Sequence, residues 1–378
     1  MRKRIITVSL LLLFALLTAG LQGCSVDEAE VWSPGMPLDR SDVMIGIIFL
    51  DDAESGWSLA HDLGLREAQR EFGLSDGQIT RKFNVSEENA GNIEYAISEA
   101  IAEGANIIIA PSWGFMDVCE QMSIEHPNVI FAHASGYKSN DTNFTNYFGR
   151  MYQARYLTGI AAGLKTQTGK IGFVAAQGIS NSEVTGWLNA FAMGVESVNP
   201  DARIYVSVTN SWFDPAGERR AAQILIDEGC DVIAQHCDTV EPQIAAENAG
   251  VWGIGNNVDM SSAAPGAVLT SAVWNWGSYY KMLIGSIIDG SFTTEPHFGG
   301  LADGMVNIAP ITPSLATPGM AEAIEDARAR IINGNYNVFD GVMETNDGRT
   351  FGQPGGTLSD DEITGGMNWY YRNIAVLD

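Results

Sequence analysis

Short apolar runs alternate with longer amphipathic segments along most of the chain, and this alternation constrains the fold more than any other feature. Each apolar run has the length of a buried strand, and the segments between them carry apolar residues at helical spacing. Strands separated by helices form parallel βαβ units, so the pattern predicts an α/β fold with doubly wound sheets. The first series comprises a strand at 43–50, a helix at 56–72, a strand at 79–85, a helix at 87–103 capped by Ser86, a strand at 105–110, a helix at 116–125 and a strand at 128–134.

The same alternation starts again near residue 150. Two consecutive α/β units of this size predict two similar lobes. The second series comprises a helix at 150–167 that is rich in small residues, a strand at 170–176, a helix at 184–199, a strand at 202–209, a helix at 215–228, a strand at 231–236, a helix at 241–250 and strands at 251–255 and 268–273.

The N-terminus has the layout of an export signal. Three basic residues precede an apolar stretch from Ile5 to Leu17, which at about 13 residues is too short to cross ~30 Å of hydrocarbon. Leu21-Gln-Gly-Cys24 follows, and a cysteine at the cleavage point resembles a lipoprotein signal. We therefore expect residues 1–23 to be removed, Cys24 to carry a lipid anchor and residues 24–41 to form a tether in the cell envelope, outside the cytoplasmic membrane. A plain signal peptide with an incidental cysteine is the alternative.

The expected mature chain is strongly acidic. Loss of Arg2, Lys3 and Arg4 leaves 18 basic against 46 acidic residues, a net charge of about −28. Such a surface repels phosphate backbones, so nucleic acid is not expected as a partner, and anionic ligands are disfavoured. In so acidic a chain we expect the pair Asp360-Asp361 to be solvated. After Cys24, no apolar run reaches the 18 residues of a membrane span.

Three further cysteines, Cys119, Cys230 and Cys237, are expected to be buried apolar residues. Their odd number leaves at least one thiol unpaired. Cys230 and Cys237 lie at opposite ends of one expected strand, ~20 Å apart at the rise of a strand, which argues against a disulfide between them.

The loops that follow the expected strands carry the candidate binding residues. In open parallel sheets, ligands bind beyond the carboxyl ends of the strands. Five of the nine tryptophans fall in such loops, and exposed aromatic clusters mark binding sites. In the alternative interpretation, each tryptophan fills the core of its own lobe. The candidate ligand-binding residues are Asp51, Trp57, Ser58, His61, Trp113, Phe115, His133, Trp212, Gln235, Asp238, Asn257 and Trp274.

Two indoles on opposed lobes would enclose a flat ring between them. Stacking of a base on an aromatic side chain contributes ~1–3 kcal/mol. The Asn, Gln, His, Asp and Ser side chains beside the tryptophans would then read the edges of the ring by hydrogen bonds. The pattern therefore favours a small aromatic ligand.

Catalytic and metal-binding interpretations find little support in the sequence. It lacks a G-x-S-x-G elbow, a Walker loop and an H-E-x-x-H helix. Three histidines could meet neighbouring acids at a metal, but without the spacing of a zinc site they are expected to be hydrogen-bonding members of a pocket or core. These residues are His61, His133 and His236, with Asp62 and Asp238. We therefore expect no enzyme activity, no cofactor and no metal.

From Val43 to about Asp340, the chain resembles the basic membrane protein (BMP) family of ABC-importer lipoproteins. The stretch that carries this resemblance best is Phe148–Ala176, FGRMYQARYLTGIAAGLKTQTGKIGFVAA, and shorter matches follow at Asn199-Pro200, Trp212-Phe-Asp214, Gly229–Gln235 and Ile254-Gly255. The resemblance implies a type I periplasmic binding protein fold, in which two Rossmann-like lobes with parallel sheets are joined by a three-strand hinge. It also implies an ABC permease and ATPase complex as partner.

The same resemblance implies the division of the chain between the lobes. The chain would leave the first lobe near Phe148 and return to it near Trp274. The N-terminal lobe would then comprise residues 42–148 and 275–308, and the C-terminal lobe residues 149–274 and 309–378. Closure of the two lobes around a ligand would be a hinge motion.

The resemblance assigns roles residue by residue. Trp57 and Trp212 match the two aromatic positions that stack on the base in nucleoside-binding members. Asn257 and Trp274 stand where those members carry an Asp and a Lys around the ribose. A carboxylate holds hydroxyls by charge-assisted bonds about twice as strong as neutral ones, and an indole takes up room that a sugar needs. The chain therefore departs from the nucleoside-binding pattern.

A sub-branch of the family offers a closer likeness, through Gly56-Trp57 with His61-Asp62, Trp212–Pro215 and Gln235-His236-x-Asp238. That likeness implies a free purine base as ligand, adenine first. A purine nucleoside or a small sugar-like ligand is the alternative among binding proteins. A sensory subunit, and an enzyme such as a nucleoside hydrolase that uses Asp51 and Asp52, are alternatives of other classes.

Overall fold

The computed structural model describes residues 32–377. The expected signal peptide, the expected lipidation site Cys24 and residues 24–31 of the expected tether lie outside the described residues. From Ser33 onwards, the chain forms one compact unit that contains two large sheets.

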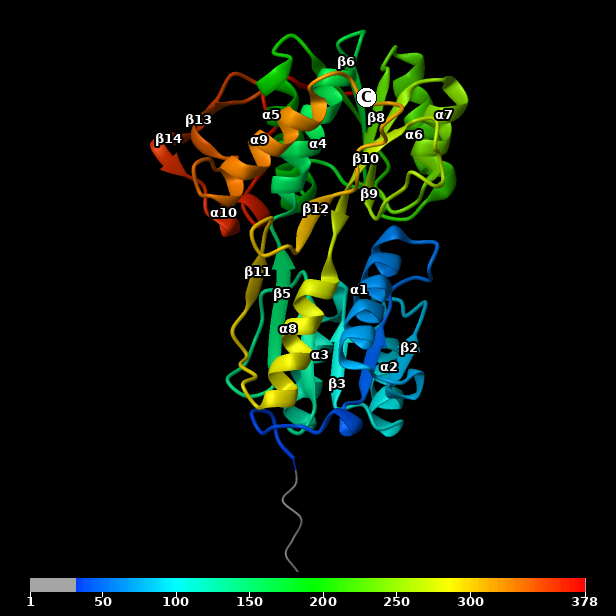
Figure 1. Cartoon of the computed structure of the whole chain (residues 1–378), viewed down its shortest axis with the longest axis vertical. Coiled ribbons are helices and arrows are strands. Elements are labelled where there is room, and N and C mark those ends of the chain that lie inside the picture. Colours follow the sequence, from blue (N-terminus) through cyan, green and yellow to red (C-terminus); the bar gives the residue numbers. More distant parts are fainter. Residues whose placement is uncertain (1–31, 378) are drawn as a thin grey trace, which may run out of the picture. The chain divides into compact units, whose positions relative to one another are not determined.

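The first sheet has six strands, all parallel, in the order β11-β5-β4-β3-β1-β2. Most of its inner strands are buried along their whole length, as expected where helices cover both faces. In Figure 1, α1 and α8 lie side by side on this sheet, while α2 packs against α3. The elements are β1 (Ile45–Ile48), α1 (Gly56–Phe72), β2 (Ile79–Lys82), α2 (Ala90–Ala102), β3 (Ile107–Ala110), α3 (Met116–Glu125), β4 (Ile130–Ala134), β5 (Phe144–Gly149), α8 (Trp276–Asp289) and β11 (His297–Gly299).

The second sheet has seven strands in the order β12-β10-β9-β8-β6-β7-β15. All neighbours are parallel except β10 and β12. Its elements are α4 (Met151–Lys165), β6 (Lys170–Ala175), α5 (Ser182–Val198), β7 (Arg203–Val208), α6 (Pro215–Asp227), β8 (Val232–Gln235), α7 (Glu241–Ala249), β9 (Trp252–Asn257), β10 (Val268–Trp274), β12 (Val306–Ile308), α9 (Met320–Ile332) and β15 (Ile374–Val376). A hairpin of β13 (Asp340–Glu344) and β14 (Thr350–Thr357) and the short helix α10 (Asp360–Thr364) precede β15.

Small residues let α4 and α5 approach each other closely. A Cβ atom on Gly159 would lie 2.1 Å from the carbonyl oxygen of Phe191, and one on Gly194 would lie 2.1 Å from that of Tyr156. No larger side chain fits at either position without separating the helices. The small residues predicted in the helix at 150–167 therefore serve this contact.

Two predicted details differ from the structure. Helix α2 begins at Ala90, and its cap is Asn89, whose side chain accepts a hydrogen bond from the N–H of Gly91. Ser86, the predicted cap, accepts one from the N–H of Glu88 in the preceding turn. In addition, the family resemblance implied that residues up to 308 belong with the first sheet, but β12 pairs with β10 in the second sheet.

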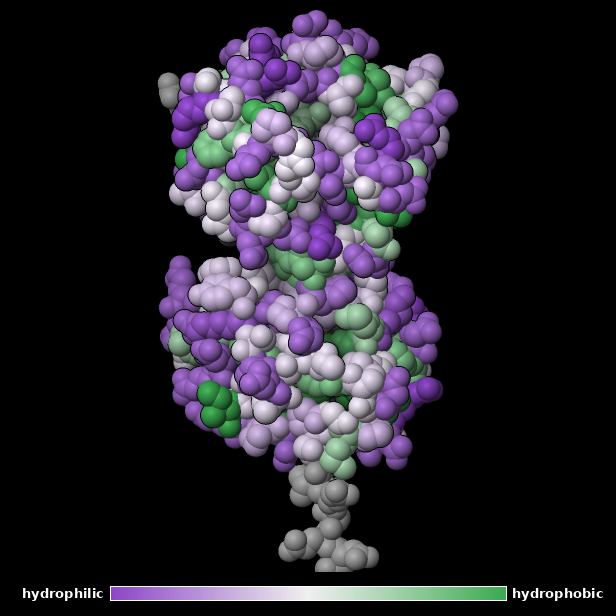
Figure 2. Space-filling view, turned by 90° about the vertical axis from the view of Figure 1, so that its left-hand side faces the viewer, coloured by the Kyte–Doolittle hydropathy of each residue, from purple (hydrophilic) through white to green (hydrophobic). Residues whose placement is uncertain are grey.

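The surface is mainly polar. Figure 2 shows one face on which hydrophilic side chains dominate and apolar ones form small, separate groups. Across residues 32–377, no helix has both the length and the apolar character needed to span a bilayer. The three cysteines of this part of the chain are free and buried, and burial raises the pKa of the Cys230 thiol to about 12.

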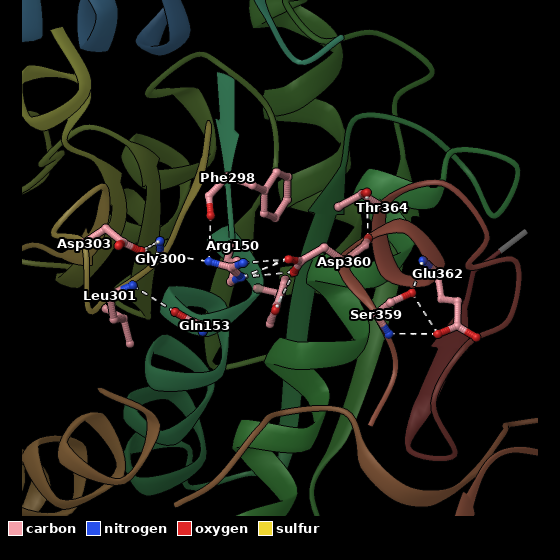
Figure 3. Close-up of polar contacts among 11 residues, drawn as sticks. Arg150, Gln153, Phe298, Gly300, Leu301, Asp303, Ser359, Asp360, Glu362 and Thr364 are labelled. Atoms are coloured by element: carbon pink, nitrogen blue, oxygen red, sulfur yellow. Dashed lines mark hydrogen bonds and ion pairs between the residues drawn. The ribbon is translucent and has the colours of Figure 1, made fainter. Parts of the chain in front are cut away.

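Arg150 joins three segments at the crossing between the sheets (Figure 3). It follows β5, and one nitrogen of its guanidinium group donates to the carbonyl oxygen of Phe298 in β11 at 2.6 Å. Two other nitrogens donate to both carboxylate oxygens of Asp360 in α10, at 2.8 to 3.1 Å. The Tyr152 hydroxyl donates to the same carboxylate at 2.9 Å.

This contact corrects the prediction that the pair Asp360-Asp361 is solvated. Asp361 is exposed, but Asp360 is an ion-pair partner with a side chain that is 29% exposed. The sequence shows two adjacent acids and gives no sign that Arg150, 210 positions away, meets one of them. The C-terminal segment is thereby tied to two of the crossing strands.

Asp360→Ala is expected to lower the free energy of unfolding by about 1–2 kcal/mol, because it leaves Arg150 without its two-pronged partner. Asp361→Ala is the matched control: it removes an acid from the same helical turn and should change stability by less than about 0.5 kcal/mol. Thermal or urea unfolding of both variants measures the difference. Equal effects of the two substitutions would show that the ion pair adds nothing.

Candidate ligand-binding site

A pocket lies between the two sheets, and residues that follow the carboxyl ends of strands in both sheets form its walls. Its empty space amounts to about 580 Å³, part of it open to solvent. The lining contains four tryptophans. The lining residues are Leu50, Trp57, Glu87, Ser112, Trp113, Ser135, Glu183, Trp187, Trp212, His236, Asp238, Asn256 and Asn257.

The indole of Trp57 is fixed from several sides. Ser55 caps α1 by accepting the N–H of Ser58, which sets Trp57 in the first turn of the helix. The indole N–H donates to the carbonyl oxygen of Pro111, after β3, at 2.7 Å. The rings of His61 and Trp276 meet the indole edge-on, with centroids at 4.6 and 5.5 Å. Trp57 therefore presents a rigid face to the pocket.

The wall from the second sheet is built around His236, which follows β8. Trp212, after β7, meets the imidazole edge-on with ring centroids 5.3 Å apart, and Trp187 of α5 lies 4.5 Å from it. The guanidinium carbon of Arg155 lies 5.9 Å from the centroid of Trp187, within cation–π range. Arg155 is fully buried, so this indole rests on a charged side chain.

The start of α1 touches the loop after β8. The N–H of Gly56 donates to the carbonyl oxygen of Asp238 at 2.8 Å, and the Ser55 hydroxyl donates to the Asp238 carboxylate at 3.4 Å. The amide of Asn257 donates to the same carboxylate at 2.8 Å. A Cβ atom on Gly56 would lie 3.0 Å from the Asp238 carbonyl oxygen, so glycine permits this approach.

Burial raises the pKa of acids in the pocket wall and beside it. Burial raises the pKa of Asp238 well above its usual range, and Glu218 and Asp51 add to the rise. Burial also raises the pKa of Asp51, with a further contribution from Asp52. Burial raises the pKa of Glu183 to about 7, against the opposing effect of Arg155. A ligand that brings negative charge is therefore disfavoured here.

The positively charged side chain near these acids, Arg155, already donates its hydrogen bonds to other groups. Burial lowers the pKa of Arg155 to about 9, which leaves it protonated at neutral pH. Its guanidinium donates to the carbonyl oxygen of Gln235 and to the side chain of Asn256. Burial, aided by Arg155, lowers the pKa of His236 well below its ordinary value, so this imidazole is neutral.

The structure brings five of the predicted site residues together in the pocket, one of them largely exposed. They are Trp57, Trp113, Trp212, Asp238 and Asn257. Seven others do not line the pocket. They are Asp51, Ser58, His61, Phe115, His133, Gln235 and Trp274.

Most of these seven lie in the interior behind the pocket. His61 stacks on Trp276 and is hydrogen-bonded to the Tyr280 hydroxyl at 2.6 Å. Trp274 also stacks on Trp276, with ring centroids 4.2 Å apart. Gln235 donates to two backbone carbonyls of the loop after its own strand. His61, Trp274 and Gln235 are therefore buried and do not line the pocket.

Phe115, His133 and Ser58 are also fully buried. Phe115 belongs to the apolar core between β3 and α3. A nitrogen of His133 lies 2.7 Å from the carbonyl oxygen of Ser112, and burial lowers the pKa of His133 to about 4. The Ser58 hydroxyl accepts a hydrogen bond from the N–H of Asp51. Within residues 32–377, no three His, Cys, Asp or Glu side chains lie close enough to hold a metal ion.

Sequence reasoning did not select two residues of α5, Glu183 and Trp187, although both line the pocket. The loop from β6 to α5 carries no aromatic residue and so gave no signal. Glu183 nevertheless follows a strand at its carboxyl end, which is the position where ligands bind. Trp187 lies four residues later, on the same face of the helix, and could have been found with it.

Comparisons with known proteins agree with the architecture. A family model for PnrA-like ABC transporter substrate-binding proteins matches residues 46–339. A purine-binding protein of Brucella abortus is 33% identical over 331 residues, 87% of this chain and 92% of that protein. A putative ABC transporter glucose-binding protein of Haloferax volcanii is 31% identical over 320 residues, 84% of this chain and 80% of that protein. An ABC transporter nucleoside-binding protein of Lactococcus lactis is 23% identical over 367 residues, 89% of this chain and 99% of that protein.

A solved structure supports the fold alone. The solute-binding protein of an ABC transporter system from Conexibacter woesei superposes with a TM-score of 0.64 at 20% sequence identity. The match covers 78% of this chain and 98% of that one. The two-sheet arrangement is therefore shared with a transport receptor.

The pKa of Glu183 predicts how stability depends on pH. The folded state holds this proton up to about pH 7, whereas an unfolded glutamate releases it near its ordinary value of 4.5. Because the folded state binds more protons between these values, this residue makes stability fall as the pH rises from about 4.5 to 7. Glu183→Gln should reduce that fall, so its stability relative to the natural chain should be higher at pH 8 than at pH 5.

Unfolding midpoints measured from pH 5 to pH 8 check this prediction. Glu88→Gln is the control, because Glu88 is exposed and should leave the pH profile unchanged. Parallel profiles for Glu183→Gln and the natural chain would contradict the raised pKa.

Proposed function

This chain belongs to the family of PnrA-like ABC transporter substrate-binding proteins, and we propose that it binds a purine nucleobase, adenine first, for its importer. The family and the type I periplasmic binding protein fold are those of extracytoplasmic receptors and not of enzymes. Receptors of this class deliver their ligand to a permease and its ATPase. The proposal concerns the ligand and the way in which the pocket holds it.

The observation that carries the proposal is that indoles from both sheets line one pocket. Trp57 lies in α1, which follows β1 of the first sheet, and Trp212 lies in the loop that follows β7 of the second sheet. Each indole has a neighbouring imidazole against its edge or face, His61 for Trp57 and His236 for Trp212, which limits its rotation. A planar heterocycle between such rings gains stacking of ~1–3 kcal/mol per contact.

Electrostatics support an uncharged ligand with hydrogen-bond donors. The carboxyl groups of Glu87, Glu183 and Asp238 line the pocket, whereas no lysine or arginine does among the described residues. A phosphate group would meet these acids without a cation to pair with, so nucleotides are poor candidates. A neutral base or nucleoside avoids that cost.

The polar lining favours a base over a nucleoside. Asn257 stands where nucleoside-binding members carry a ribose-holding acid, and its amide is already bonded to Asp238. Relatives are named as purine-, nucleoside- and glucose-binding, so the ligand test must include all three kinds. Calorimetry against adenine, guanine, hypoxanthine, their nucleosides and glucose tests the proposal, and it fails if a nucleoside or glucose binds more tightly than every base.

Trp57→Ala and Trp212→Ala are each expected to weaken base binding by about 1–3 kcal/mol, because each removes one stacking face. Calorimetry with the best-bound base measures the loss. Trp252→Ala is the matched control. Trp252 is the first residue of β9, where its ring contacts Lys165, and it does not line the pocket. Its loss should leave affinity unchanged. Unchanged affinity in both pocket variants would rule out stacking.

We also propose that Cys24 carries the lipid that anchors the receptor at the membrane. Cys24→Ser should then move the protein from the membrane fraction to the soluble fraction of the expressing cells, because the tether loses its acyl chains. Fractionation followed by immunoblotting measures the change. If the serine variant stays with the membrane, Cys24 is not the anchor.

A further inference from the structure

Glu183 is the second residue of α5, in the wall of the pocket that the second sheet supplies. Asn181 caps this helix by accepting the N–H of Val184, so Glu183 is not needed as the cap. Its side chain is 26% exposed, and it lines the same pocket as Trp187 and His236. The backbone thus fixes where the carboxyl group enters the pocket.

This carboxyl group has no hydrogen-bond partner among residues 32–377. An imidazole nitrogen of His236 lies 3.9 Å from a carboxylate oxygen, beyond hydrogen-bond distance. His236 is neutral, so it offers no compensating charge. Arg155 acts on Glu183 only through space, because its guanidinium donates to Gln235 and Asn256.

Other glutamates near the pocket are satisfied by the protein itself. Glu87 accepts hydrogen bonds from the Ser112 hydroxyl at 2.5 Å and from the N–H of Gly114 at 3.1 Å. Glu218 accepts from the N–H and the hydroxyl of Thr239. Glu183 accepts no such bond from the described residues, and only part of its side chain is exposed to water. Glu183 therefore differs from Glu87 and Glu218 because no group of the described protein donates a hydrogen bond to it.

We infer that Glu183 determines ligand specificity by accepting a hydrogen bond from an N–H group of the bound heterocycle. This inference rests on the proposed purine ligand. A charged acceptor in a desolvated wall makes a bond about twice as strong as a neutral one. Purine bases offer such donors: the ring N–H that a nucleoside lacks and, in adenine, the exocyclic amine. One methyl group on the ring nitrogen, or two on the exocyclic nitrogen, removes the donor and leaves the flat ring intact.

Glu183→Gln with a set of methylated bases tests the inference. The natural chain should bind adenine about tenfold to a hundredfold more tightly than the variant does, because the bond to a charged acceptor is lost. 9-Methyladenine and N6,N6-dimethyladenine, which lack the ring donor and the exocyclic donors respectively, are then compared in both chains. One of the two should bind the natural chain weakly and lose little further affinity in the variant, since the methyl group and the substitution remove the same contact.

Proton release gives a second readout, which a purely structural role would not move. A donor to the carboxylate favours its charged form and lowers its pKa, so binding near pH 7 should release a proton from Glu183. Calorimetry in buffers of different ionisation enthalpy measures this release, and it should disappear in Glu183→Gln. Asp238 also lines the pocket with a raised pKa, so the part of the release that survives the substitution is not from Glu183.

Glu88→Gln is the matched control and should match the natural chain in affinity and proton release, because Glu88 is exposed and does not line the pocket. If the natural chain binds no purine, the proposed function itself fails. If it binds purines and Glu183→Gln binds them equally well, or if neither methylated base shows the shared loss, only the role of Glu183 is overturned.

Discussion

Parallel strands deliver the loops at their carboxyl ends to one edge of a sheet, and the pocket depends on this geometry. Leu50 follows β1, Trp113 follows β3, Trp212 follows β7 and Asp238 follows β8. Residues from distant parts of the chain therefore line one pocket. The hydrogen bond from Gly56 to the Asp238 carbonyl joins the two edges directly. Without that arrangement, the aromatic residues would be scattered surface groups.

Desolvation gives the pocket its chemical character. Burial raises the pKa of Asp238 and of Glu183 in its lining, and the buried cation Arg155 donates to a backbone carbonyl and to an amide side chain. Such a site is costly for the protein alone, and it favours a ligand that brings N–H groups without negative charge. Tryptophan faces supply the remaining contact area, so shape and polarity select for the same class of molecule.

Sequence reasoning reached the alternation of elements because strand and helix periods differ strongly, and the family resemblance is confirmed. It found Trp57 and Trp212 because an indole in a loop is conspicuous. It missed Glu183, one acid among 46, because its significance lies in the absence of a partner, which only coordinates reveal. It could not separate Trp274 from the pocket residues, since the last residue of a strand can point to either side. The β13–β14 hairpin and α10 were not predicted, because these elements are short and their apolar residues show no clear periodicity.

Neither sheet is built from a continuous stretch of chain. The first receives an edge strand from residues 297–299 and the second from residues 374–376. During synthesis, both sheets therefore remain incomplete until these late residues have been made, and their most distant pairings form last. Each sheet therefore reaches its final strand order only after segments far apart in the sequence have been brought together.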